Sequence, residues 1–258
     1  MSVLRIMSAR AVKGAVSAIA AEFSRATDHN TSFDFAPVGT LEAKLAAGAV
    51  ADVIILSTAA LTKIETTLEP GSRRALGRAS IGVAVKVGAP PPDIATPEAF
   101  RRALLAARSI AVSDIAVGGT AGKHLAQMFE RIGIADAIDR KVLRCSSGAD
   151  VTQRVADGEA EIGMTFISEM LPIAGARVVG PLPSPLGSDT TYEAAVGLSS
   201  GDRTAAAALI EALTRPDARD LWKDAGFELP MSSDEVGSPR RRLRHCVGRL
   251  ANASSSVN

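Results

Sequence analysis

Aromatic side chains are scarce in this sequence. Phe, Trp and Tyr together make up 3% of the 258 residues, with one Trp and one Tyr, and the formal net charge is only +1. Proteins that bind nucleic acid usually carry a basic surface and aromatic rings on which bases stack. We therefore expect no nucleic-acid partner. The same scarcity implies a core of aliphatic residues, which is typical of buried parallel strands.

Residues that commonly hold metals or cofactors are also few. The two cysteines, Cys145 and Cys246, are far apart, and the three histidines are scattered, so no metal-ligand spacing is present. We expect both thiols to be free and reduced. A P-loop, a G-x-S-x-G nucleophile elbow and a G-x-G-x-x-G dinucleotide motif are missing as well. We expect neither a metal nor a cofactor.

Long apolar segments are missing too. Met1 leads directly into an apolar stretch at residues 3–7, without the charged segment and apolar core of a signal peptide. No run approaches the roughly 20 apolar residues that span a bilayer. We expect a soluble chain without membrane insertion. As written it is cytoplasmic, and it is periplasmic if the start codon is misassigned or a signal has been removed.

What the chain does contain is an alternation of short apolar strands and helices. Strands are predicted at residues 3–7, 33–35, 53–56, 81–87, 110–112, 141–144, 161–166, 177–179 and 192–198. Helices lie between most of them, and Thr40 is expected to cap one at residues 41–47. This order predicts an α/β fold with two doubly wound lobes and a ligand cleft between them.

The predicted lobes are discontinuous in sequence. A proline-rich break at residues 88–93 marks a crossover, and the last apolar strand returns to the first domain. Lobe I is therefore expected to comprise residues 1–84 and 194–230, and lobe II residues 85–193. From residue 231 onward the chain is basic and then small and polar, so we expect a disordered tail. We expect a monomer.

The candidate binding residues follow the carboxyl ends of the predicted strands, where open parallel sheets bind ligands. Backbone N–H groups at helix N-termini bind anions at such places. The stretch at residues 109–124 combines a strand, a glycine pair and a helix start. The residues expected to line the site are Ser8, Arg10, Gly39, Thr40, Ser57, Ser113, Gly119, Thr120, Ser147, Ala149, Thr165 and Phe166.

Arg10 stands out because it carries a guanidinium in a turn of small residues. There it can make a bidentate contact with a carboxylate, and the alternative is a solvated surface arginine. If the protein moves a proton, the candidate bases are Asp114, His124 and Glu169, and no pattern favours one of them. Each also has a structural interpretation. Asp114 is typical of a helix cap, His124 of an exposed or core residue, and Glu169 of a hinge contact.

Five stretches carry a resemblance to a known family. They are Ser8-Ala9-Arg10-Ala11, L-E-A-K-L-A-A-G-A-V-A-D-V-I-I-L at residues 41–56, I-G-V-A-V-K at 81–86, the segment 113–122, and V-A-D-G-E-A-E-I-G-M-T-F at 155–166. Over residues 3–230 the chain resembles the type II periplasmic solute-binding proteins of ABC importers, in particular the molybdate-binding branch. The resemblance implies two lobes joined by two crossover strands, an oxyanion held by neutral hydrogen-bond donors, and closure about a hinge.

Three departures from that branch change the expected ligand. The family usually has a serine near the position of Ala11, so the resemblance adds Ala11 to the binding residues. In this sequence the residue beside it is Arg10. The family tyrosine that ends a G-x-x-Y strand is Phe166, so one hydroxyl donor is missing, and the secretion signal is absent. Fewer neutral donors and an added guanidinium favour a small carboxylate over molybdate.

We expect the protein to bind a small anion, either an oxyanion or an organic carboxylate, as the substrate-binding component of an ABC transporter with a permease as partner. The alternative is a cofactor-independent isomerase, because aconitate isomerase resembles molybdate-binding proteins and acts on a tricarboxylate. Such an enzyme would hold carboxylates with Arg10 and backbone N–H groups and stabilise an enolate-like intermediate. A third possibility is a cytosolic anion sensor.

Overall fold

The computed structural model describes residues 2–229, in which strands and helices alternate. The strands are β1 (Ser2–Ala9), β2 (His29–Ala36), β3 (Val53–Ser57), β4 (Arg74–Lys86), β5 (Ile110–Ser113), β6 (Val142–Cys145), β7 (Ile162–Phe166), β8 (Ala176–Pro181), β9 (Asp189–Val196) and β10 (Phe227–Glu228). The α-helices are α1 (Lys13–Ala26), α2 (Val38–Ala46), α3 (Thr58–Lys63), α4 (Pro97–Ala106), α5 (Thr120–Arg131), α6 (Ala135–Ile138), α7 (Gly148–Asp157), α8 (Ile167–Met170), α9 (Arg203–Thr214) and α10 (Arg219–Asp224). Short 3-10 helices are η1 (Arg10–Val12), η2 (Glu65–Thr67), η3 (Ile115–Val117), η4 (Asp139–Lys141) and η5 (Pro216–Ala218).

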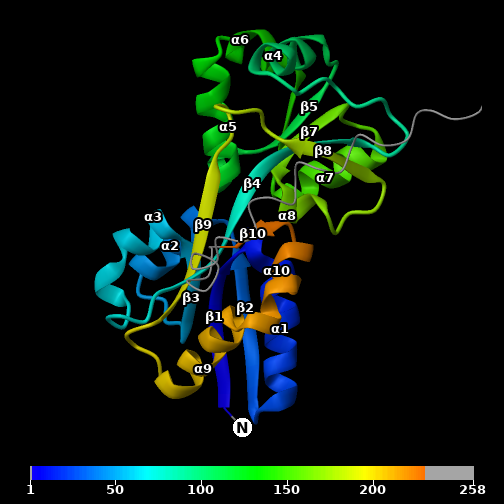
Figure 1. The fold of residues 1–258 in the computed structure, drawn as a ribbon. Helices are drawn as coiled ribbons and strands as arrows, with labels where there is room; N and C mark the ends of the chain where they lie inside the picture. Colours follow the sequence, from blue (N-terminus) through cyan, green and yellow to red (C-terminus); the bar gives the residue numbers. More distant parts are fainter. Residues whose placement is uncertain (1, 230–258) are drawn as a thin grey trace, which may run out of the picture.

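The strands form two lobes that share β4 (Figure 1). Lobe I contains β1, β2, β3, β9 and β10, and β4 pairs with β9 and β10 there through residues 74–80. Lobe II contains β5 to β8, and β4 pairs with β7 and β8 there through residues 81–86. The whole path is β2-β1-β3-β9-β4-β7-β5-β6.

Strand direction differs between the outer and the central part of this sheet. The pairs β1–β2, β1–β3, β5–β6 and β5–β7 are parallel, as the strand–helix alternation predicts. β4 and β9 are antiparallel to all their partners. Both strands run along the junction in Figure 1, so the connection between the lobes is an antiparallel pair.

The core is mainly aliphatic, as the composition implies, and four of its aromatic rings gather near the junction. Tyr192 on β9 packs edge-on against Phe166 and Phe227, with ring centroids 6.1 and 6.3 Å apart. Trp222 packs edge-on against Phe227 at 5.0 Å, and its indole N–H donates to the Leu213 carbonyl at 2.9 Å. Such edge-to-face contacts stabilise the place where β9 leaves lobe I.

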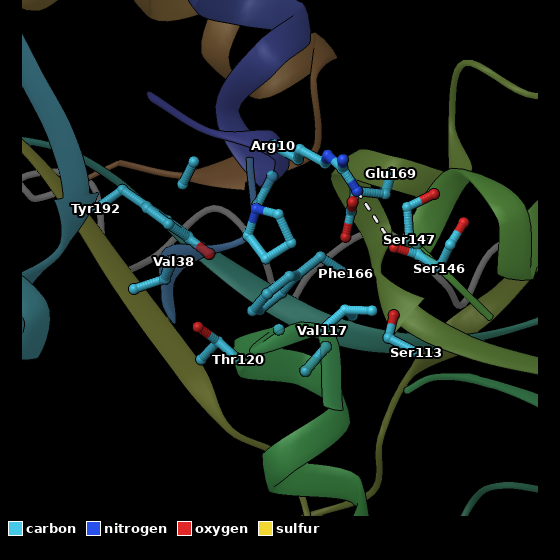
Figure 2. A pocket seen from close by; sticks show the side chains of 16 residues that line it. Arg10, Val38, Ser113, Val117, Thr120, Ser146, Ser147, Phe166, Glu169 and Tyr192 are labelled. Carbon is cyan, nitrogen blue, oxygen red and sulfur yellow. Dashed lines mark hydrogen bonds between the residues drawn. The ribbon is translucent and has the colours of Figure 1, made fainter. Parts of the chain in front are cut away.

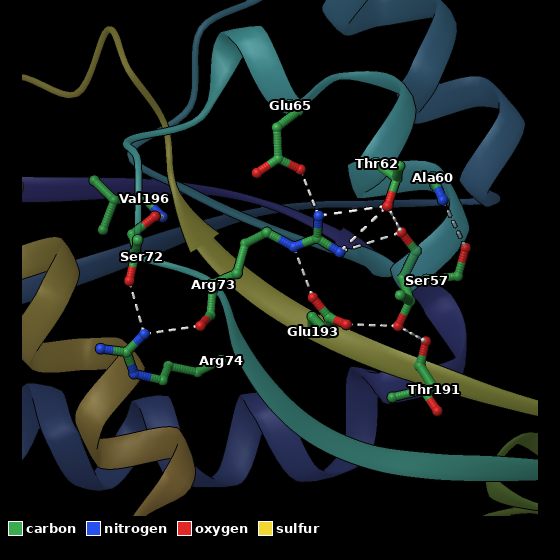
Figure 3. A network of polar contacts seen from close by, with 12 residues as sticks. Ser57, Ala60, Thr62, Glu65, Ser72, Arg73, Arg74, Thr191, Glu193 and Val196 are labelled. Carbon is green, nitrogen blue, oxygen red and sulfur yellow. Dashed lines mark hydrogen bonds and ion pairs between the residues drawn. The ribbon is translucent and has the colours of Figure 1, made fainter.

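A polar cluster holds α3 against the crossing strand β9 (Figure 3). The Arg73 guanidinium donates to the Glu193 carboxylate at 2.8 Å and also pairs with Glu65. The Thr58 hydroxyl donates to Glu193 at 2.7 Å. Arg73 and Glu193 are only 22% and 15% exposed, so solvent screens this pair less than an exposed one. The cluster fixes the lobe I end of β9.

Two local predictions are wrong. Thr40 does not cap a helix, because α2 begins at Val38 and Thr40 lies inside it. Pro37 is the residue before the helix, and its fixed φ of −57° suits that position. The fourth strand begins at Arg74 rather than at residue 81, because its first half mixes exposed arginines with buried small and apolar residues and forms no continuous apolar run.

The described residues also bear on three other expectations. Cys145 is a free, buried thiol, and burial raises its pKa to about 11. Cys246 and the tail from residue 231 lie outside the described residues. No helix within residues 2–229 is long and apolar enough to cross a membrane.

Candidate functional site

A cavity lies between the lobes, beside β9 (Figure 2). Its empty volume, including the open solvent at its mouth, is about 400 Å³. A hollow of this size is typical of small-molecule sites and accommodates an oxyanion or a small organic carboxylate. The lining residues are Ala9, Arg10, Ala11, Pro37, Val38, Ser113, Val117, Gly119, Thr120, Ala121, Ser146, Ser147, Gly148, Phe166, Glu169 and Tyr192.

Besides the single turn of α8 after Phe166, three helix starts that border the cavity lack a side-chain cap. η1 follows Ala9, α2 follows Pro37 and α5 follows Gly119, and no side chain within residues 2–229 caps any of them. In α7, by contrast, the Ser147 hydroxyl accepts from the Asp150 N–H at 3.1 Å. The first N–H groups of a helix have no intrahelical acceptor, and the helix dipole favours a negative charge beside them. The three uncapped starts therefore suit an anion in the cavity.

Hydroxyl groups supply neutral donors around the same space. Ser113, Thr120 and Tyr192 surround the cavity, and none of their hydroxyls has a hydrogen-bond partner among the described residues (Figure 2). Burial raises the pKa of Tyr192 above its usual range, so this hydroxyl keeps its proton. Tyr192 lies next to Phe166, with ring centroids 6.1 Å apart, and its hydroxyl lines the cavity although Phe166 itself carries none.

Arg10 reaches across the cavity from lobe I to lobe II. Its Nη1 donates to the carbonyl oxygen of Ser146 at 3.2 Å, which Figure 2 marks with a dashed line. The side chain is half-buried in the cavity wall. One of the five guanidinium N–H groups suffices for the Ser146 contact, which leaves others to bind a ligand. Of the two sequence interpretations, the structure therefore favours a position in the site over a solvated surface arginine.

Glu169 places a carboxyl group in the cavity. The Thr165 hydroxyl donates to its Oε2 at 3.0 Å, and the backbone N–H of Gly148 donates to the same carboxyl group. Burial raises the pKa of Glu169 above its usual range, against the opposing effects of these two hydrogen bonds and of the Arg10 charge. A Cβ on residue 148 would overlap this carboxyl group, so only glycine leaves room for it.

The other two candidate bases lie outside the cavity. The Asp114 carboxylate accepts from the Ala116 N–H at 3.0 Å and caps η3, which agrees with its structural interpretation. The His124 Nε2 hydrogen-bonds to the Leu186 carbonyl oxygen at 2.9 Å. Of the three candidates, Glu169 is the one whose carboxyl group lines the cavity.

The predicted binding residues divide into two sets. Those that line the cavity are Arg10, Ala11, Ser113, Gly119, Thr120, Ser147 and Phe166. Those that the structure places elsewhere are Ser8, Gly39, Thr40, Ser57, Ala149 and Thr165.

Residues of the second set have local roles instead. The Ser8 hydroxyl donates to the Ala9 carbonyl at 3.3 Å, and the Ser57 hydroxyl caps α3 by accepting from Ala60 at 3.4 Å. Thr165 orients Glu169. None of these three hydroxyls is therefore directed at a ligand.

Gly39 and Thr40 join the two lobes at the edge of the cavity. The Gly39 N–H donates to the Gly118 carbonyl at 3.2 Å, and the Thr40 hydroxyl donates to the Val117 carbonyl at 3.5 Å. A Cβ on Gly39 would lie 3.2 Å from the Gly118 Cα and oxygen. The two backbones therefore approach as closely as they do because both residues lack a side chain.

Sequence reasoning missed several lining residues. Tyr192 has a signal, because it is the one tyrosine of the chain and lies on the returning strand. Val38, Val117 and Ser146 have no such signal in the sequence, because each lines the cavity only once the two lobes are packed together. The structure also shows no group of three or more His, Cys, Asp and Glu side chains within residues 2–229 that could hold a metal.

The chain thus has two lobes joined by crossing strands, and the cavity between them is lined by neutral hydrogen-bond donors and one guanidinium. These features define a two-lobed ligand-binding protein. Residues 4–228 match the bacterial extracellular solute-binding protein family, and the chain belongs to that family.

Individual proteins agree with this assignment. The chain is 30% identical over 235 residues to the aconitate isomerase of Pseudomonas sp, covering 88% of each chain. It is 28% identical over 223 residues to the molybdate-binding protein of Azotobacter vinelandii, covering 82% of this chain and 84% of the relative. Among solved structures, the periplasmic molybdate-binding protein of Azotobacter vinelandii superposes with a TM-score of 0.73 at 19% identity, over 88% of this chain and 100% of that one. That likeness shows the same fold.

Proposed function

We propose that the protein binds a small organic carboxylate in the cavity between its lobes. The observation that carries this proposal is the convergence of the Arg10 guanidinium and three uncapped helix starts on one cavity. Guanidinium and backbone N–H groups are both donors that match carboxylate oxygens. The hollow of about 400 Å³ has room for a small organic acid.

A carboxylate is favoured over molybdate because of the charged groups in the cavity. Neutral donors such as Ser113, Thr120 and Tyr192 suit either ligand. Arg10 and Glu169 are additional, and they place a guanidinium and a carboxyl group beside the neutral donors. An organic acid has several polar groups and can use both side chains at once.

Ligand screening by thermal unfolding tests this proposal. We expect tricarballylate, citrate or succinate to raise the melting temperature, and molybdate, tungstate and sulfate to leave it unchanged. At 100 times its dissociation constant a ligand adds about 2.7 kcal/mol of apparent stability, which is readily measured. Stabilisation by molybdate or tungstate without any by a carboxylate would overturn the proposal.

An arginine variant locates the site. A charge-assisted hydrogen bond contributes about 1.5–3 kcal/mol, so Arg10→Ala is expected to weaken carboxylate binding by about 10- to 100-fold. The matched control is Arg25→Ala, because Arg25 is exposed on α1 and its Nε donates to the Ala21 carbonyl of its own helix. Equal affinity of both variants would show that Arg10 does not hold the ligand.

We also propose that the protein serves as the substrate-binding component of an ABC importer, with a permease as partner. Membership of the solute-binding family and the two-lobed fold support this role. Loss of the gene is expected to abolish uptake of the radiolabelled carboxylate that stabilises the protein. Unchanged uptake would contradict the transport role.

A cofactor-independent isomerase is the second candidate function. The carboxyl group of Glu169 in the cavity favours it, and the aconitate isomerase of Pseudomonas sp is a relative. A proton would leave a carbon next to a carboxylate, with Arg10 and the helix N–H groups stabilising the enolate-like intermediate. Incubation with aconitate in deuterated water distinguishes the two functions by proton NMR. Loss of C–H signals supports the isomerase, and their retention supports binding alone.

A further inference from the structure

The carboxyl group of Glu169 is held in one orientation by two donors. α8 follows β7 directly, so Glu169 in α8 lies close to Thr165 near the end of β7. The Thr165 hydroxyl donates to the Glu169 Oε2 at 3.0 Å. The N–H of Gly148, the first residue of α7, donates to the same group. One side of the carboxyl group thus faces its two donors, and the group as a whole borders the cavity (Figure 2).

No cation pairs directly with this carboxyl group. Arg10 contributes a favourable charge, yet no basic side chain within residues 2–229 comes within 4.0 Å of the Glu169 oxygens. An ionised Glu169 would therefore repel an anion bound in the cavity beside it. A protonated Glu169 has the opposite effect, because its O–H is a hydrogen-bond donor.

We propose that Glu169 carries a proton when the cavity is occupied and donates that proton in a hydrogen bond to a carboxylate oxygen of the ligand. This inference rests on the proposed function, since it takes an organic carboxylate as the ligand. The Thr165 hydroxyl donates to Oε2, so the other oxygen, Oε1, can carry the proton while this hydrogen bond is kept. Glu169 thereby acts as a specificity residue for anions that accept a hydrogen bond from a neutral acid.

The surrounding charged groups are compatible with this protonation state. From η1, Arg10 favours the ionised form of Glu169, but burial outweighs it and raises the pKa. From β9, Tyr192 is neutral. On α7, Asp150 and Arg154 pair with each other at 3.2 Å. A bound anion raises the pKa of Glu169 further, because it favours the neutral form.

Carbon-13 NMR of protein labelled at the glutamate carboxyl groups tests the protonation state directly. The Glu169 signal is the one that disappears in Glu169→Gln. With saturating tricarballylate at pH 7, the pH at which the affinities are compared, we expect this signal at the position of a protonated carboxyl group. A signal at the ionised position in the complex would overturn the inference.

The same variant gives a second readout. The amide that Glu169→Gln introduces carries no charge and retains a donor and an acceptor, so the variant is expected to bind tricarballylate within about fivefold of the wild-type affinity at pH 7. A larger loss of affinity in a folded Glu169→Gln protein would show that the ionised form is required. Glu211→Gln, on the exposed face of α9, is the control and is expected to change neither readout.

The outcomes separate this inference from the proposed function. If wild-type protein binds no carboxylate, the proposed function fails. If it binds tricarballylate with an ionised Glu169, the proposed function stands and the inference about Glu169 fails.

Discussion

Replacing Gly39 by alanine tests how contact between the lobes contributes to binding. Gly39 lies in α2 and its N–H donates to the Gly118 carbonyl of the other lobe at 3.2 Å. A Cβ would lie 3.2 Å from the Gly118 backbone, which is tighter than about nine in ten Cβ contacts in proteins. The two backbones must therefore separate by a few tenths of an ångström, which lengthens a hydrogen bond that is already long.

Two opposing effects of this substitution can be separated. Alanine in place of a helical glycine stabilises the fold by about 0.5–1 kcal/mol, and it does so equally whether the lobes touch or not. Losing the Gly39–Gly118 hydrogen bond costs about 1 kcal/mol in the closed arrangement alone. The population of closed protein should fall about fivefold, and the apparent dissociation constant should rise by the same factor where the open form dominates.

Isothermal titration with tricarballylate and thermal melts of the free protein measure these two effects. We expect Gly39→Ala to bind about fivefold more weakly without a lower melting temperature. Gly14→Ala is the matched control, because Gly14 is exposed on α1 and a Cβ there has nothing within 4 Å. Equal affinities for the two variants would refute the reasoning.

Two further substitutions follow from the structure. Asp52 is 4% exposed, and its carboxylate accepts hydrogen bonds from the backbone N–H groups of Arg5 at 2.8 Å and Gly201 at 3.1 Å. Asp52→Asn is therefore expected to lower the free energy of unfolding, measured in urea at pH 7, by about 3 kcal/mol. Burial opposes ionisation of Asp52, but these hydrogen bonds hold its pKa below the usual 3.8. The difference in the free energy of unfolding between wild type and Asp52→Asn should therefore be complete above about pH 5 and shrink as the pH falls below 4. A difference that does not change with pH would contradict this. Gly148→Ala should displace the Glu169 carboxyl group and weaken tricarballylate binding more than tenfold in titration calorimetry, and an unchanged affinity would show that Glu169 does not contact the ligand.

Local patterns in the chain were sufficient for much of the fold. Apolar runs of four to eight residues mark the buried strands, and small residues after them mark the helix starts, since both signals depend on neighbours in sequence. The prediction of Arg10 and of the segment at residues 113–120 follows from the same rule, because the carboxyl ends of parallel strands share one edge of a sheet. The proline-rich break at residues 88–93 and the family resemblance together indicated the two-lobed arrangement.

What the sequence alone determined is therefore the alternation of elements, the aliphatic core and the sheet edge at which a ligand site forms. Only the tertiary structure decided which groups meet there. Tyr192 lines the cavity because β9 crosses between the lobes, and Gly39 contacts Gly118 because the start of α2 meets the segment before α5. Glu169 becomes part of the site because α7 and β7 place two donors around it. These contacts join residues far apart in the chain or depend on the packing of separate elements, so no local pattern records them.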